Sequence, residues 1–216
     1  MQTDIYLIQR RNMVRFDLMG IESKRVLNAM LTVPRHLFIP HQQRKNAYKS
    51  EDVPISQFIS TPPPLVVAKT IELLNLNGTE KVLEVGTGRG YQTALLAELA
   101  KEVYSIEIVP DIAKDAKRTL KLLNYKNVNL LIGDGFKGWE KHQPYDAILV
   151  MASVKTPPSP LLAQLAPKGR LVIPIGPPEE QSLVLYRKKD GKLHEEAVMP
   201  VHLKPMEGQA TGHSWE

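Results

Sequence analysis

Short apolar runs alternate with stretches of helical periodicity through the middle of the chain. The runs that have the length of a β-strand are 81–85, 103–108, 127–134, 145–151 and 169–176. The stretches in which apolar residues recur at helical spacing are 90–101, 110–123 and 161–166. Strands that alternate with helices in this way form βαβ units. We therefore predict an α/β, doubly wound fold with a mostly parallel sheet and helices on both faces.

The segments that flank this region predict different elements. Helical spacing at 20–33 ends before Pro34, and it resumes at 65–75. Residues 52–64 are expected to be irregular, because they end in a run of prolines that neither a helix interior nor a central strand accepts. Residues 182–203 have no helix signal and predict two strands.

The length of 216 residues predicts one domain with small appendages. We divide the chain into an N-terminal helical segment with a loop at 1–64, a core at 65–180, C-terminal strands at 181–205 and a tail at 206–216. The tail after Pro205 is polar, and we expect it to be mobile.

Composition narrows the classes of function. The chain has 28 basic and 23 acidic residues, and a formal net charge of +5 is too small to predict a nucleic-acid partner. It has no cysteine, which excludes disulfides and cysteine nucleophiles, and its six histidines lack metal-binding spacing, so no metal is expected. Because no apolar run resembles a membrane span or a secretory signal, the expected location is the cytoplasm, with no membrane partner.

A glycine-rich turn follows the first strand of the alternating region. Residues 84–90 read EVGTGRG and lead into the helix predicted at 90–101. Glycines at such a turn let the backbone approach a ligand closely. The spacing is not the G-x-G-x-x-G of dinucleotide-binding proteins, and no G-K-[ST] follows, which argues against a P-loop.

Acidic residues end the next two strands. Glu107 closes the strand at 103–108, where a carboxylate can accept hydrogen bonds from both hydroxyls of a ribose. Asp134 lies between two glycines after the following strand, where it can reach an adenine amino group. In an unrelated doubly wound sheet, Glu107 would instead be a solvated strand end.

These loops together fit S-adenosylmethionine (AdoMet), which we predict as the cofactor. Gln92 is equally consistent with a cofactor contact and with a solvated residue in the first turn of a helix. The predicted cofactor-binding residues are Glu84, Gly86, Thr87, Gly88, Gln92, Glu107, Ile108, Asp134 and Gly135.

Three motifs resemble the protein-L-isoaspartate O-methyltransferase family: VPRHLFIP at 33–40, GTGRGYQ at 86–92 and GDGFKGW at 133–139. The resemblance extends over about residues 10–190. It implies a Rossmann-like, AdoMet-dependent methyltransferase fold with an added N-terminal helical segment and a C-terminal β extension. It also implies methylation of the free carboxylate of L-isoaspartyl residues in age-damaged proteins or peptides, carried out by a monomer or a weak homo-oligomer.

The reaction implied by this resemblance requires few catalytic side chains. A carboxylate is ionised at neutral pH, so no strong general base is required. Methylation turns the carboxylate into a better leaving group, so that a succinimide re-forms and part of it opens to normal aspartate. Catalysis can therefore rest on positioning and desolvating the two reactants.

One departure from the family concerns the loop before the helix at 65–75. The family has Gly-x-Gly-Gln-Thr-Ile-Ser-x-Pro there, and its serine lies beside the transferred methyl group. An ungapped alignment puts Pro62 at the serine position, whereas a shift of two residues leaves Ser60 there. We favour Ser60 as the catalytic residue because the shift preserves four motif residues, although it requires a compensating pair of indels.

A second departure follows the strand at 145–151, where the family usually has Val-Thr-Ala-Ala and this chain has VMAS at 150–153. Met151 removes a hydroxyl group on the acceptor side. Two alternatives therefore remain beside isoaspartyl repair: a methyltransferase for another acceptor, and an AdoMet-binding module with impaired catalysis. The [D/N]-P-P-[Y/F] motif of base amino-group methylation is missing here.

Overall fold

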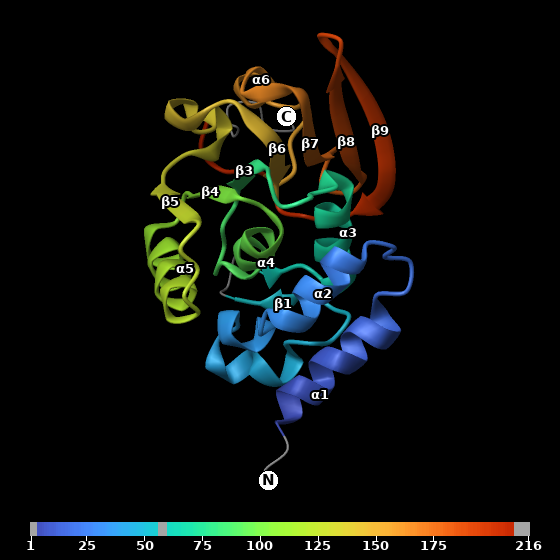
Figure 1. Ribbon diagram of the computed structural model, residues 1–216, viewed down its shortest axis with the longest axis vertical. Helices are drawn as coiled ribbons and strands as arrows, with labels where there is room; N and C mark the ends of the chain where they lie inside the picture. The colour runs from blue at the N-terminus through green and yellow to red at the C-terminus, as the bar shows by residue number, and fades with distance from the viewer. Residues whose placement is uncertain (1–3, 56–59, 210–216) are drawn as a thin grey trace.

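A seven-stranded sheet forms the centre of the computed structural model, which describes residues 4–55 and 60–209 (Figure 1). Its strand order is β5-β4-β3-β6-β7-β8-β9; the first five of these are parallel, and β8 and β9 are antiparallel. The strands are β3 (Lys81–Val85), β4 (Glu102–Glu107), β5 (Val128–Ile132), β6 (Tyr145–Val150), β7 (Leu165–Ile175), β8 (Gln181–Lys189) and β9 (Lys192–Val201). The predicted mostly parallel α/β fold is confirmed.

The order of the strands creates a place for a ligand. The chain runs outward from β3 through β4 to β5, and then returns to the other side of β3 as β6. In open α/β sheets, ligands bind outside the carboxyl ends of the strands where the winding direction switches in this way. Here that place lies at the carboxyl ends of β3 and β6.

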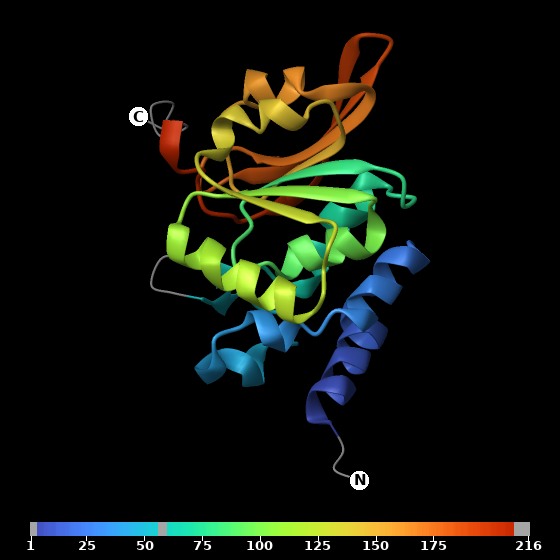
Figure 2. The ribbon, with the colours of Figure 1, turned by 60° about the vertical axis from the view of Figure 1, so that its left-hand side comes forward.

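Helices cover both faces of the sheet, as predicted (Figure 2). The elements that pack on the faces are α3 (Pro64–Leu74), α4 (Tyr91–Leu99) and α5 (Pro110–Leu122) on one side, and η4 (Gly135–Lys137), η5 (Glu140–His142) and α6 (Ser159–Ala163) on the other. Because successive strand residues point to opposite faces, Val82 joins one apolar cluster and Leu83 the other. In the described part of the chain, no helix is long and apolar enough to span a membrane.

The boundary between α6 and β7 differs from the prediction. The helix was expected at 161–166 and the strand from 169, but β7 begins at Leu165. The reason is a pairing that local periodicity does not contain: Leu165 lies opposite Tyr145, across an irregularity in the register of β6 and β7.

The N-terminal segment is helical, as the family resemblance implied, but its first helix was not predicted. The elements are α1 (Ile5–Asn12), η1 (Met13–Asp17), α2 (Lys24–Thr32), η2 (Arg35–Phe38) and η3 (His41–Asn46). No residue of α1 is buried, so the apolar periodicity that reveals a helix is weak there. The helix predicted at 20–33 begins later, at Lys24, because the Ser23 hydroxyl caps it by accepting the Val26 N–H at 3.4 Å.

The stretch expected to be irregular at 52–64 contains a short hairpin. β1 (Val53–Pro54) pairs antiparallel with β2 (Ser60–Thr61), and α3 begins at Pro64. Proline fits both places, because β1 is an edge strand and the first turn of a helix needs no N–H donor there. The hairpin determines where Ser60 lies.

Residues 202–209, which we term the C-terminal strap, cross the carboxyl edge of the sheet. The Leu203 N–H donates to Gln181 Oε1 at 2.7 Å, the Met206 N–H to the Ser153 carbonyl at 2.9 Å, and the Gln209 N–H to Asp134 Oδ2 at 2.8 Å. Met206 is only 5% exposed. The expectation of a mobile tail from 206 is therefore wrong for residues 206–209, because one apolar side chain and these bonds anchor them. Residues 210–216 lie outside the described part.

Replacing Met206 with alanine tests the anchoring of the strap. Loss of a buried methionine side chain is expected to lower the free energy of unfolding by about 2–5 kcal/mol. The matched control is Met19→Ala, because Met19 is 79% exposed. Urea denaturation of both variants measures the difference, and equal stabilities would mean that Met206 contributes nothing to the fold.

Candidate active site

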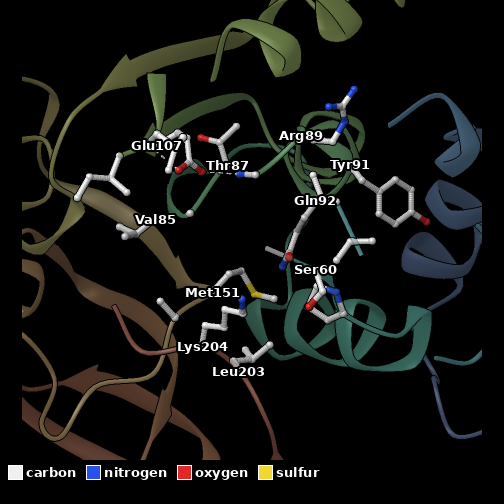
Figure 3. Close-up of a pocket in the computed structure, with 18 of the residues that line it drawn as sticks. Ser60, Val85, Thr87, Arg89, Tyr91, Gln92, Glu107, Met151, Leu203 and Lys204 are labelled. Atoms are coloured by element: carbon white, nitrogen blue, oxygen red, sulfur yellow. Dashed lines mark hydrogen bonds between the residues drawn. The ribbon is translucent and has the colours of Figure 1, made fainter. Parts of the chain in front are cut away.

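A cavity of about 400 Å³ opens at the carboxyl ends of β3, β4 and β6 (Figure 3). Its wall includes the loop after β3, the end of β4, the β1–β2 hairpin, the loops after β5 and β6, and the C-terminal strap. Of the predicted site residues, those that line it are Ser60, Gly86, Thr87, Gly88, Gln92, Glu107, Ile108 and Gly135. Glu84 and Asp134 lie outside the lining.

The glycine-rich loop bends sharply between β3 and α4. Gly86 and Gly90 have φ values of 97° and 93°, which L side chains rarely adopt. The N–H groups of Gly86 and Thr87 both donate to the Ile106 carbonyl, at 2.9 and 3.2 Å. A Cβ on Gly90 would approach Ala116 to 3.2 Å, so glycine also lets α5 pack closely. The loop is therefore held against the end of β4.

Glu107 is oriented by the backbone on both sides. Its Oε2 accepts the Gly88 N–H at 2.7 Å, and its Oε1 accepts the Val109 N–H at 3.0 Å. The residue is 7% exposed and lines the cavity. A carboxylate oxygen can accept more than one hydrogen bond, so both oxygens can still accept from a vicinal diol.

Glu84 lies beneath the loop, not in the cavity. Its Oε2 accepts hydrogen bonds from the hydroxyls of Thr93 at 2.5 Å and Ser105 at 2.6 Å. Ser105 in turn lies 2.5 Å from the hydroxyl of Thr87. Complete burial raises the pKa of Glu84 from 4.5 to about 7, against the lowering effect of the two hydroxyls. This geometry makes Glu84 a support for the loop that carries Thr87.

Asp134 serves the loop after β5 and the strap. Its Oδ1 accepts the Phe136 N–H at 2.9 Å, and its Oδ2 accepts the Gln209 N–H. The neighbouring Gly135 does reach the cavity, and a Cβ there would come within 2.3 Å of Val85. Glycine is therefore required at this wall, while the Asp134 carboxylate is turned toward the strap.

Ser60 and Pro62 both lie on the wall, so the two alignments of this loop put their candidate residue in the same cavity. The Pro62 carbonyl accepts a hydrogen bond from Arg35 Nη2 at 2.8 Å. Arg35 is fully buried, with its guanidinium 4.9 Å from the centre of the Tyr91 ring, and burial lowers its pKa. An arginine from the VPRHLFIP motif thus ties the loop to α4.

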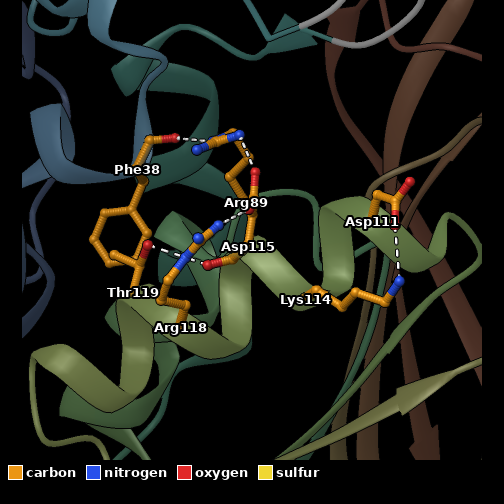
Figure 4. Close-up of polar contacts among 7 residues, drawn as sticks. All are labelled: Phe38, Arg89, Asp111, Lys114, Asp115, Arg118 and Thr119. Carbon is orange, nitrogen blue, oxygen red and sulfur yellow. Dashed lines mark hydrogen bonds and ion pairs between the residues drawn. The ribbon is translucent and has the colours of Figure 1, made fainter.

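Arg89 lines the cavity, but its charge is already engaged (Figure 4). Its Nη1 pairs with Asp115 at 2.7 Å, and its Nε donates to the Phe38 carbonyl at 3.1 Å. Asp115 also pairs with Arg118, one turn along α5. This cluster joins the N-terminal segment to α5.

Several lining residues were not predicted from the sequence, among them Asp52, Tyr91, His202 and Lys204. Tyr91 follows the glycine-rich loop directly, so its position in the sequence could have predicted that it lines the cavity. The strap residues carry no such signal, because only the tertiary fold brings them to the carboxyl edge.

Comparison with known proteins decides the family. The family model described as protein-L-isoaspartate(D-aspartate) O-methyltransferase matches residues 10–211. This chain belongs to that family. A protein-L-isoaspartate O-methyltransferase of Dictyoglomus turgidum is 47% identical over 88% of this chain and 86% of its own length. One of Shewanella sediminis, named protein-L-isoaspartate O-methyltransferase 2, is 44% identical over 98% of this chain and 88% of its own.

Solved structures agree on the fold of the family. A protein-L-isoaspartate O-methyltransferase superposes with a TM-score of 0.82 at 24% identity, covering 95% of this chain and 67% of that one. A second, from Plasmodium falciparum and in complex with S-adenosyl-L-homocysteine, gives 0.81 at 24% identity, covering 95% and 99%. The predicted Rossmann-like methyltransferase fold is confirmed, whereas the roles of individual site residues remain predictions.

The buried Glu84 of this family member should make stability depend on pH. Its pKa in the folded state lies above its ordinary value, so its favourable contribution is present below about pH 4.5 and is lost as the pH rises to about 7. Between these limits, the free energy of unfolding should fall by about 3 kcal/mol relative to Glu84→Gln, which cannot ionise.

Urea denaturation at several pH values measures this difference. Glu140→Gln, at an exposed carboxylate on η5, is the control and should follow the native profile. Parallel profiles for the native protein and Glu84→Gln would contradict an elevated pKa at this position.

Proposed function

We propose that this chain transfers the methyl group of AdoMet to the free α-carboxylate of L-isoaspartyl residues in age-damaged proteins or peptides. The observation that carries the proposal is the cavity at the carboxyl edge, built by a glycine-rich loop and Glu107, in a chain matched by the family model over residues 10–211. The names of the relatives at 47% and 44% identity support the same acceptor.

The lining residues fit AdoMet in chemistry. Glu107 offers two oriented acceptor oxygens for ribose hydroxyls, and Gly86 and Gly88 present bare backbone to the amino-acid part. Val85, Ile106 and Gly135 offer an apolar slot for adenine. When bound, AdoMet supplies an electrophilic methyl group on a positively charged sulfur. Gln92, buried and tied through Nε2 to Thr70 at 3.1 Å, is a further polar contact.

The chain has to align the acceptor and exclude water, without removing a proton. An isoaspartyl carboxylate is already ionised at neutral pH. Ser60 on the hairpin and Met151 after β6 form the wall on the acceptor side (Figure 3). The Ser60 hydroxyl can donate a hydrogen bond that orients one carboxylate oxygen and leaves the other free to attack. Alignment of this kind can supply about 7–11 kcal/mol of the barrier reduction.

A paired peptide assay tests the acceptor. A synthetic peptide with one L-isoaspartyl residue should accept labelled methyl groups from AdoMet, and the same sequence with a normal aspartyl residue should not. Ser60→Ala is expected to lower kcat by about tenfold to a hundredfold, because it removes one positioning hydrogen bond. Transfer only to other acceptors would favour a divergent methyltransferase, and AdoMet binding without any transfer would favour an impaired module.

Replacing Glu107 with glutamine tests the cofactor site separately. The amide keeps the size of the side chain, but it offers one acceptor oxygen instead of two. Affinity for S-adenosylhomocysteine should fall by about tenfold to a hundredfold in isothermal titration calorimetry. Asp111→Asn is the control, because Asp111 lies in the first turn of α5, close to Glu107 in sequence, but does not line the cavity. Unchanged affinity in Glu107→Gln would show that Glu107 does not bind the cofactor.

A further inference from the structure

The C-terminal strap is fixed to the sheet where it passes the cavity. The buried Gln181 accepts the Leu203 N–H through Oε1 and donates through Nε2 to the Leu203 carbonyl at 2.8 Å. The buried Ser153 donates its N–H to the Lys204 carbonyl at 2.9 Å and accepts the Met206 N–H at its own carbonyl. The backbone on both sides of Lys204 is therefore held in one register.

This register directs the Lys204 side chain at the cavity. Lys204 lines the cavity, and it extends from the strap toward Met151, on the side away from Glu107 (Figure 3). Its ammonium has no ion pair or hydrogen bond within residues 4–55 and 60–209. The residue as a whole is exposed, so it stands at the mouth and not on the floor.

None of the other described charged residues that line the cavity offers a free positive charge to an anion. The Arg89 guanidinium is engaged by Asp115 and the Phe38 carbonyl. Asp52 and Glu207 are carboxylates and repel an anion, while His202 carries an imidazole and not an ammonium group. Lys204 is therefore the lining residue, among those described, that offers a permanent and unengaged positive charge.

We propose that Lys204 binds the carboxylate of the isoaspartyl acceptor and determines specificity for an anionic acceptor; this inference rests on the proposed function. A residue of a protein substrate must approach from solvent, and Lys204 is the cation that it meets at the mouth. The proposed function puts the donor deeper in the cavity, at the half-buried Gly86 and Gly88 and the buried Gln92, and Lys204 is the one lysine among the described residues that lines the cavity.

The pairing has a kinetic signature. The ammonium attracts the carboxylate before reaction, and this attraction is lost once an ester oxygen replaces the anionic one. In the transition state the carboxylate still carries part of its charge, so Lys204 stabilises the bound acceptor and the transition state to a similar extent. Its removal should therefore raise KM for the acceptor with little change in kcat. The neutral ester leaves the site more easily than the anionic acceptor does.

Three variants separate this role from others. Lys204→Met keeps the length and apolar stem but removes the charge, Lys204→Arg keeps the charge, and Lys192→Met removes an exposed lysine on the β8–β9 hairpin away from the cavity. Initial rates are measured against the isoaspartyl peptide at saturating AdoMet, and against AdoMet at saturating peptide. Circular dichroism melting curves confirm that each variant is folded.

Lys204→Met should raise KM for the peptide by about tenfold and change kcat by less than about threefold. KM for AdoMet should stay unchanged, the dependence of kcat/KM on ionic strength should weaken, and Lys204→Arg and Lys192→Met should resemble the native protein.

Two results overturn the inference while the native enzyme remains active. An unchanged KM for the peptide in Lys204→Met shows that the charge does not meet the acceptor. A rise in KM for AdoMet alone shows that Lys204 instead serves the carboxylate of the donor. No turnover of the isoaspartyl peptide by the native protein is a different failure, because it rejects the proposed function and this inference together.

Discussion

The end of β4 is the point on which the whole site depends. Its last two residues hold the glycine-rich loop from two directions: the Ile106 carbonyl binds the N–H groups of Gly86 and Thr87, and the Glu107 carboxylate binds the N–H of Gly88. A loop with several positive φ values has many alternatives in the unfolded chain, and these bonds select one of them. The same carboxylate that fixes the loop also lines the cavity, so one group both holds the loop and presents its oxygens to the site.

Buried polar groups behind the cavity reinforce this arrangement from below. The side chains of Glu84, Thr93, Ser105 and Thr87 form a continuous chain of contacts between β3, α4 and β4. A buried carboxyl in an apolar layer is unfavourable unless it is hydrogen-bonded. Oε2 of Glu84 has two hydroxyl partners and Oε1 has none among the described residues, and the two partners belong to elements that must come together for the loop to form. Arg35 connects the N-terminal segment to the loop before α3, because its guanidinium donates a hydrogen bond to the Pro62 carbonyl.

The sequence predicts most of the core because its elements are decided locally. KVLEV at 81–85 is a strand at those residues, and Pro110 begins α5 as expected. Helix α1 could not be predicted, because none of its residues is buried. The start of β7 could not be predicted either, because it depends on pairing with β6. The cavity floor could be predicted from the glycine-rich loop, but the wall formed by residues 202–209 could not, since only long-range bonds to Gln181, Ser153 and Asp134 bring it there.

The strap also has a consequence for the order in which the protein matures on the ribosome. The floor of the cavity is complete once β6 has emerged, but the strap is translated only after β9. During synthesis, the carboxyl edge of the sheet is therefore open on one side. A nascent chain that has already folded its parallel strands still lacks the part of the cavity wall that the strap supplies. The part of the cavity wall that residues 202–207 supply is therefore added after the sheet has formed.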